Sequence, residues 1–142
     1  MNLHRLLYER HTAGKPVRVA LIGAGKFGSM FLSQVPHTPG LEVPVIVDLD
    51  PQRAQDACRT VGWDDARIAA TTFTDDASKA FDQVEVVVEA TGNPAVGIRH
   101  ARAAIAAGKH IVMVNVEADV LAGPLLADEA RKAGVVYSLA YG

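Results

Sequence analysis

Three glycines in residues 23–28 have the spacing of a phosphate-binding loop. The segment reads GAGKFG, which fits the pattern G-x-G-x-x-G, and it lies between an apolar run and a helical pattern. In such a loop Gly23 permits a tight turn, Gly25 lets a pyrophosphate approach the backbone, and Gly28 lets helix and strand pack closely. Free amides at the helix start would bind the phosphates. The predicted dinucleotide-binding loop consists of Gly23, Ala24, Gly25, Lys26, Phe27 and Gly28.

An acidic residue lies where the ribose of a dinucleotide would bind. Without one the glycines would indicate only a tight turn, but Asp48 ends the apolar run VPVIV, 48 − 28 = 20 residues after the last glycine. A carboxylate at this place binds the adenosine ribose hydroxyls, and it repels the 2′-phosphate of NADP. Arg53 would bind such a phosphate, or it is a solvated helix residue. The predicted cofactor is NAD or NADP, with a slight preference for NAD.

Polar residues also follow the apolar run at residues 85–90. Thr91 and Gly92 stand at its end, where an open sheet of alternating strands and helices binds its ligands. Both residues are therefore predicted to contact the cofactor. Thr91 and Asn93 are equally typical of caps at the start of the next helix, and the two roles are compatible.

In the stretch HIVMVNVEADV, residues 110–120, an apolar run is followed by the polar residues Asn115, Glu117 and Asp119. As the end of a further strand it would face the nicotinamide, so Asn115 is predicted to bind the nicotinamide ribose or amide. Glu117 is the candidate catalytic residue, as a general base, a substrate ligand or one part of a metal site. The alternative is a solvated loop that carries acids, and for Asp119 this alternative is favoured.

Other reactive side chains give weak signals. Cys58 is the only cysteine, which excludes a disulfide framework or a thiolate cluster, and we expect it to be a packing residue. No two of the five histidines have the spacing of metal ligands, and none is assigned a catalytic role. No metal site is predicted.

The elements that must position these residues alternate along the chain. Helices are expected at residues 27–35, 51–61, 94–107 and 124–133, with a short one from residue 75. Strands are expected at residues 17–23, 43–48, 85–91, 110–115 and 135–140, with a weak one at 68–72. This alternation predicts an α/β Rossmann fold, a doubly wound, mostly parallel sheet of about six strands with helices on both faces.

The composition is that of one soluble domain. The chain has 142 residues, of which 49% are hydrophobic and 21% charged, and its net charge of -2 gives no sign of nucleic-acid binding. No apolar run is long enough for a membrane span, and the amino terminus does not read as a signal peptide, so a cytoplasmic location is expected. We expect a helical lead-in at residues 1–14 and one dinucleotide-binding domain at residues 15–142.

Four segments together resemble a known family. RVALIGAGKFG, VVVEATGNP, GKHIVMVNVEADV and AGVVYSLA are similar to the amino-terminal domain of the homoserine dehydrogenase-like oxidoreductases. The branch it resembles includes SAF-domain proteins and deoxyxylulose phosphate reductoisomerase-like enzymes. The resemblance implies an NAD(P)-dependent oxidoreductase acting on a small polar carbonyl or alcohol, phosphorylated or not. It also implies that Thr91, Gly92 and Asn115 face the nicotinamide half of the cofactor.

The chain departs from that family in two ways. Homoserine dehydrogenases read T-A-N-K where this chain has Val114-Asn115-Val116, so Val116 replaces a lysine that lies close to the substrate, and homoserine dehydrogenase activity is not expected. Family members also continue into a catalytic and oligomerisation domain. We therefore expect the catalytic domain to be missing and expect no turnover by this chain alone. The chain is compatible with a homo-oligomer. The alternative is a non-catalytic dinucleotide-binding sensor or scaffold module.

Overall fold

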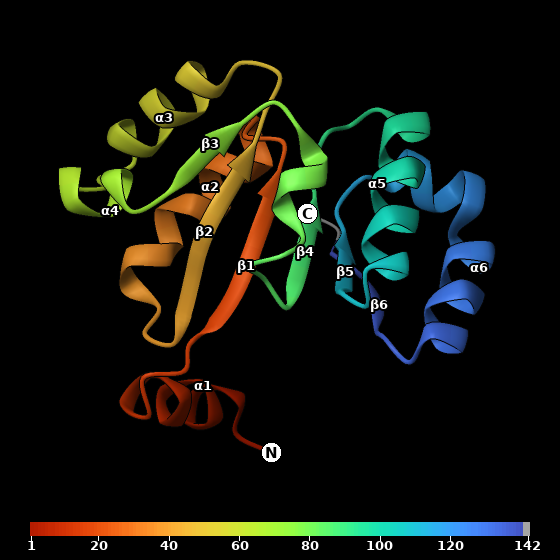
Figure 1. Cartoon of the computed structure of the whole chain (residues 1–142), viewed down its shortest axis with the longest axis horizontal. Coiled ribbons are helices and arrows are strands. Elements are labelled where there is room, and N and C mark those ends of the chain that lie inside the picture. The colour runs from red at the N-terminus through yellow and green to blue at the C-terminus, as the bar shows by residue number, and fades with distance from the viewer. Residues whose placement is uncertain (141–142) are drawn as a thin grey trace.

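The structure, a computed structural model that describes residues 1–140, contains one six-stranded sheet (Figure 1). Its strands are β1 Val17–Ile22, β2 Leu41–Val47, β3 Thr72–Thr74, β4 Val86–Glu89, β5 His110–Met113 and β6 Tyr137–Leu139. They pair in the order β3-β2-β1-β4-β5-β6, and all five pairings are parallel. From β1 the sheet grows through β2 to β3 on one side. The chain then returns to pair β4 with the other edge of β1 and continues through β5 to β6, so the switch point lies between β1 and β4. The predicted Rossmann fold is confirmed; Tyr141 and Gly142 lie outside the described residues.

Helices cover both faces of the sheet. They are α1 Leu3–Thr12, α2 Lys26–Gln34, α3 Pro51–Thr60, α4 Asp65–Ala69, α5 Pro94–Ala106 and α6 Val116–Ala133, with 3-10 helices η1 Val35–His37 and η2 Ala77–Ala80. One buried cluster joins residues of α2 and α3 to one face of the strands, and a second joins residues of α5, α6 and η2 to the other face. Two layers of helices thus enclose a buried parallel sheet, as βαβ crossovers require.

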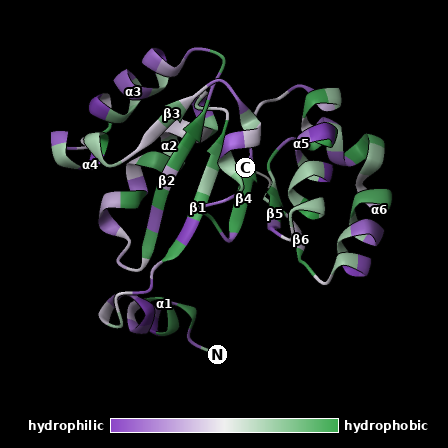
Figure 2. Cartoon of the chain, viewed as in Figure 1, coloured by the Kyte–Doolittle hydropathy of each residue, from purple (hydrophilic) through white to green (hydrophobic). Residues whose placement is uncertain are grey.

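The apolar residues follow this layering. Figure 2 shows hydrophobic residues along the central strands and many hydrophilic residues on α3. Leu21 and Ile22, neighbours in β1, point to opposite faces of the sheet and are at most 1% exposed. Cys58 lies in the α2/α3 cluster, and burial raises the pKa of its thiol to about 11. The cysteine is therefore an unionised packing residue, as expected.

The weak strand predicted at residues 68–72 is wrong. Ile68 lies in α4, and the strand is β3, which begins at Thr72 and pairs with Val45 of β2. The side chain of Asp64 accepts a hydrogen bond from the Arg67 N–H at 2.8 Å, which caps a short helix. Ile68 is then the apolar residue that anchors this helix, at 5% exposure.

The predicted start of the last helix is also wrong. The structure has no polar loop after β5; α6 begins at Val116, and Pro124 lies inside the helix instead of at its start. Asn115 is the N-cap, since its Oδ1 accepts from the Ala118 N–H at 3.1 Å. Glu117 and Asp119 lie in the first turn, where the helix dipole favours acids. Asn115, Glu117 and Asp119 therefore belong to the start of a helix.

The lead-in predicted before residue 15 is the helix α1, below the sheet in Figure 1. It lies against the turn before β2, because a Cβ on Gly40 would stand 2.1 Å from the Leu7 carbonyl oxygen. Arg10 also donates a hydrogen bond to Glu85 at 2.8 Å. Within residues 1–140 no helix has the length and apolar character needed to cross a membrane.

Replacing Asn115 with alanine should lower the free energy of unfolding by about 1–3 kcal/mol. The change removes the α6 cap and one of the two hydrogen bonds to the Asn93 carbonyl, which accepts from the Asn115 side chain at 2.8 Å and from the Gly97 N–H at 2.8 Å. Urea denaturation measures the loss. The matched control is Asp64→Ala, an exposed cap with one such bond, which should lose about 1 kcal/mol. An equal or smaller loss for Asn115→Ala would contradict this account.

Candidate functional site

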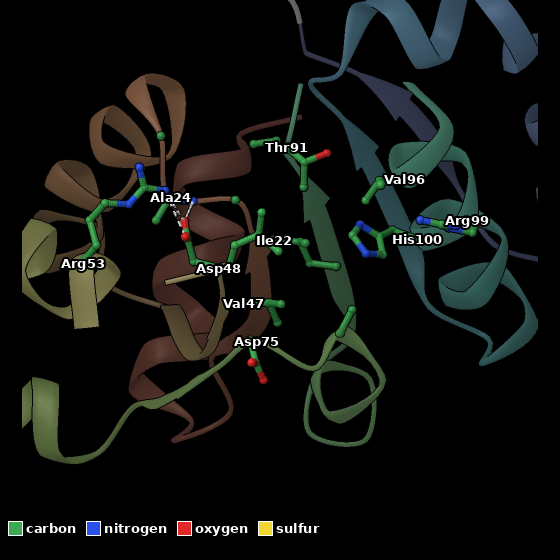
Figure 3. Close-up of a pocket in the computed structure, with 15 residues that line it drawn as sticks. Ile22, Ala24, Val47, Asp48, Arg53, Asp75, Thr91, Val96, Arg99 and His100 are labelled. Carbon is green, nitrogen blue, oxygen red and sulfur yellow. Dashed lines mark hydrogen bonds and ion pairs between the residues drawn. The ribbon is translucent and has the colours of Figure 1, made fainter. Parts of the chain in front are cut away.

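A cavity of about 380 Å³ opens at the carboxyl ends of β1, β2 and β4, at the switch point of the sheet (Figure 3). The glycine loop forms one wall, and α5 forms the wall opposite. Its lining comprises Ile22, Gly23, Ala24, Gly25, Val47, Asp48, Leu49, Arg53, Asp75, Ala77, Ala90, Thr91, Val96, Arg99 and His100. The position is where doubly wound sheets bind their ligands.

Each of the three glycines has a different structural reason. Gly23 has a φ of +95°, and a Cβ there would also stand 2.8 Å from the Ala90 carbonyl carbon. A Cβ on Gly28 would stand 2.5 Å from the Gly23 carbonyl oxygen, so this glycine lets α2 approach the loop. A Cβ on Gly25 would meet no heavy atom within 4 Å. The absent side chain of Gly25 therefore leaves open space at the cavity wall, which suits the close approach of a phosphate.

The start of α2 has no side-chain cap. Its N-cap is Gly25, and in the part of the chain that the structure describes no side chain accepts a hydrogen bond from the first turn. Lys26 is exposed, Phe27 is half-buried against the core and Gly28 is buried, and none of the three lines the cavity with its side chain. What this turn offers a ligand is its backbone N–H groups and the positive end of the helix dipole.

Asp48 is buried at 6% exposure, and its carboxylate holds the cavity wall together. Oδ2 accepts from the Ala24 N–H at 2.9 Å, and Oδ1 accepts from the Asp50 N–H at 2.9 Å. Burial alone would raise the pKa of this carboxyl, but the two N–H groups and the Arg53 guanidinium outweigh it, so the pKa lies below its ordinary value. Asp48 is therefore an ionised group beside the glycine loop.

Arg53 lies at the mouth of the cavity and pairs with Asp48. Its Nη2 donates to Oδ1 at 2.9 Å and to Oδ2 at 3.2 Å, while 64% of its side chain is exposed (Figure 3). The side chain thus presents positive charge to the cavity and to solvent together. The sequence treated Asp48 as a ribose ligand and Arg53 as a separate phosphate ligand. In the structure the two side chains form one ion pair.

The sequence reasoning missed one cavity residue, His100, and its buried partner, Glu89. Glu89, at the end of β4, is fully buried, and its Oε2 lies 2.5 Å from Nδ1 of His100, which comes from α5. Its Oε1 accepts from the N–H and the hydroxyl of Thr91 at 2.7 and 2.6 Å. A signal existed: an acid at the alternate position to Val87 points to the same buried face and requires a partner. Thr91 itself lines the cavity, whereas Gly92 does not.

Asn115 and Glu117 do not line this cavity, although the Asn115 side-chain nitrogen lies 3.5 Å from the hydroxyl of Thr91, which does. The Asn115 side chain is 2% exposed and binds the Asn93 carbonyl and the Ala118 N–H, so it joins the start of α6 to the start of α5. Glu117 is exposed and lines a shallow hollow together with Pro94, Val116, Val120 and Leu121. The structure therefore does not bring these two residues to the glycine loop. No group of three or more possible metal ligands occurs within residues 1–140.

Together, the parallel sheet, the open glycine loop at its switch point and the acid at the end of β2 define a dinucleotide-binding Rossmann domain. Residues 17–141 match the GFO_IDH_MocA family, described as an oxidoreductase family with an NAD-binding Rossmann fold. The chain belongs to this family.

A curated reductase is similar in sequence over most of this chain. The chain is 33% identical over 124 residues to the 4-hydroxy-tetrahydrodipicolinate reductase of Anaeromyxobacter dehalogenans strain 2CP-C, a match that covers 85% of this chain and 44% of the reductase. The chain thus spans less than half the length of this relative.

Two homoserine dehydrogenases are similar in structure. That of Thiobacillus denitrificans is 21% identical with a TM-score of 0.73, covering 88% of this chain and 29% of the enzyme. That of S. aureus, in a structure at pH 6.0, is 18% identical with a TM-score of 0.67, covering 87% and 32%. The resemblance to homoserine dehydrogenases is thereby confirmed for the fold.

Asp48→Asn should lower the free energy of unfolding at pH 7 by about 1–3 kcal/mol, because the amide cannot accept all the hydrogen bonds of the carboxylate. Since folding lowers the pKa of Asp48, its contribution is full above about pH 4 and is lost as the pH falls through the folded pKa. Urea denaturation from pH 7 to pH 3 should show the difference between the two proteins shrinking. Asp56→Asn on the exposed side of α3 should cost less than about 0.5 kcal/mol. A difference that stays constant to pH 3 would rule out this role for the ionised carboxylate.

Proposed function

We propose that this chain forms the NAD(P)-binding domain of an oxidoreductase, with residues 15–142 as the domain and residues 1–14 as a lead-in. The observation that carries the proposal is the empty space at Gly25, beside an uncapped helix start and a buried ionised Asp48. These are the three elements that a pyrophosphate and a ribose require at adjacent positions. When bound, a nicotinamide cofactor would supply the hydride chemistry, and the chain would supply binding and orientation.

In this proposal the backbone N–H groups of the first turn of α2 bind the pyrophosphate. They have no side-chain acceptor within residues 1–140, so an anion would be their partner. The glycine loop accordingly consists of residues 23–28, with Gly25 at the point of closest approach. Thr91 and Gly92 would lie toward the nicotinamide half, as the resemblance to homoserine dehydrogenase-like enzymes implies.

The proposed form of the cofactor depends on the Asp48–Arg53 pair. Both carboxylate oxygens already accept two hydrogen bonds each, so the ribose hydroxyls of NAD would have to displace Arg53 from Asp48. A 2′-phosphate would instead bind the displaced guanidinium and lie near the carboxylate. We therefore propose that NAD and NADP both bind, with the slight preference for NAD that the acid confers.

The substrate is proposed to be a small polar carbonyl or alcohol compound, which the name of the reductase relatives supports. Its binding would involve chain beyond the described residues, because the relatives are more than twice as long as the matched segment. Glu117 is the candidate general base, with Asn115 holding the start of its helix. Glu117 is exposed at the carboxyl edge of the sheet, where a second domain or subunit would have access to it.

Calorimetric titration of the purified chain with NADH and NADPH tests the proposal, and the sharpest variant is Gly25→Val. The valine side chain would fill the space left for the pyrophosphate, so affinity should fall at least a hundredfold. Its φ of −79° and the absence of neighbours within 4 Å predict a folded protein, with a slightly lower melting temperature because valine is a poorer N-cap than glycine. Gln34→Val, at the exposed far end of α2, should bind as the wild type does. Absence of heat with either cofactor from folded wild-type protein would refute the proposed function.

Arg53→Ala should change the choice between the two cofactors. Without the guanidinium the Asp48 carboxylate repels a 2′-phosphate, so NADPH affinity should fall more than tenfold. NADH affinity should stay within about threefold, because its ribose gains access to the carboxylate. Arg59→Ala, at the end of α3, serves as the charge-matched control. An equal loss for both cofactors would show that Arg53 does not contact the 2′-position.

A further inference from the structure

One cavity residue, His100, pairs with the buried Glu89 beneath the wall, and the phosphate and ribose contacts do not use this pair. Glu89 is 0% exposed and accepts three hydrogen bonds, two of them from Thr91 and one from the ring of His100. A carboxylate with no access to water has to be satisfied in this way by donors of the protein. Glu89 therefore fixes the position of the His100 ring on the second turn of α5.

The other nitrogen of His100 is available to a ligand. The side chain is 19% exposed and lines the cavity, and Figure 3 shows the ring projecting from α5 toward the ends of β1 and β4. Within residues 1–140 the ring makes one hydrogen bond, through Nδ1. Because the carboxylate oxygen of Glu89 accepts, Nδ1 carries the hydrogen, and in this tautomer Nε2 is a hydrogen-bond acceptor.

The surroundings of His100 fit a purine base. The cavity walls near the ring are apolar, formed by Ile22, Val47, Ala77, Ala90 and Val96. The lining also includes the charged side chains of Asp48, Arg53, Asp75 and Arg99, and its volume of about 380 Å³ is in the range of small-molecule sites. The same cavity continues to Asp48, so a ribose bound there would carry its base into this space.

We propose that His100 recognises the exocyclic amine of the adenine in the bound dinucleotide, accepting its hydrogen through Nε2. Glu89 is the positioning residue, which keeps the hydrogen on Nδ1 and so keeps Nε2 an acceptor. The proposal rests on the proposed function, and it makes this cavity selective for adenine over a base that has an oxygen at the same position.

The test compares NADH with reduced nicotinamide hypoxanthine dinucleotide, in which an oxygen replaces the amine. The wild-type chain should bind NADH about tenfold more tightly, the worth of one hydrogen bond. The key variant is His100→Asn, whose amide still donates to Glu89 but has no atom at the place of Nε2. It should bind both dinucleotides within about twofold of each other.

Two further variants complete the experiment. Glu89→Gln can donate to Nδ1 and thereby move the ring hydrogen to Nε2, so the preference for NADH should be lost while the melting temperature reports any folding defect. His37→Ala, an exposed histidine in η1 remote from the cavity, should keep the tenfold preference. An unchanged preference in Glu89→Gln would contradict the positioning role.

The outcomes separate this inference from the proposed function. If wild-type protein binds NADH but does not distinguish it from the hypoxanthine analogue, the role of His100 is refuted and the proposed function stands. The same holds if His100→Asn keeps the tenfold preference. If folded wild-type protein binds neither dinucleotide, both proposals are refuted.

Discussion

The candidate site depends on one buried carboxylate. Asp48 ends β2, yet it bonds to the backbone of the loop that follows β1 and to the backbone before α3. It thereby joins the carboxyl ends of two adjacent strands and the starts of the two helices that follow them. Because a buried charge without partners is costly, the loop can take few other conformations. The open shape of the glycine loop is thus set by the same residue that was expected to hold the ribose.

Much of this site could be predicted from local sequence. The apolar runs that become β1, β2, β4 and β5 are short, β-branched and bounded by glycine or polar residues, so their period and ends are evident. The loop at residues 23–28 and Asp48 are fixed by spacing along the chain, which the sequence shows directly. The glycine loop is formed by neighbouring residues, and Asp48 is separated from it by a single helix and strand.

What could not be predicted depends on contacts between distant elements. The start of α6 was missed because Asn115 reads as a strand end until its partners, Asn93 and Ala118, are in place. A proline nine residues into the pattern reinforced the error, since proline usually opens a helix or ends one. The Glu89–His100 pair was missed because it joins a strand to the second turn of the next helix, and only the packing of α5 on β4 brings the two side chains together.

The bare start of α2 sets the helix apart from its neighbours. Within residues 1–140 the other five α-helices each begin with an Asn or Asp whose side chain accepts a hydrogen bond from the first turn. Relative to glycine, such a cap stabilises a protein by only a few tenths of a kcal/mol, and α2 forgoes this stabilisation. A serine or aspartate at residue 25 would stabilise the free protein and occupy the place of the ligand. The free protein therefore has an uncapped, less stable start of α2. An anion bound there would take the place of the cap and stabilise the folded protein.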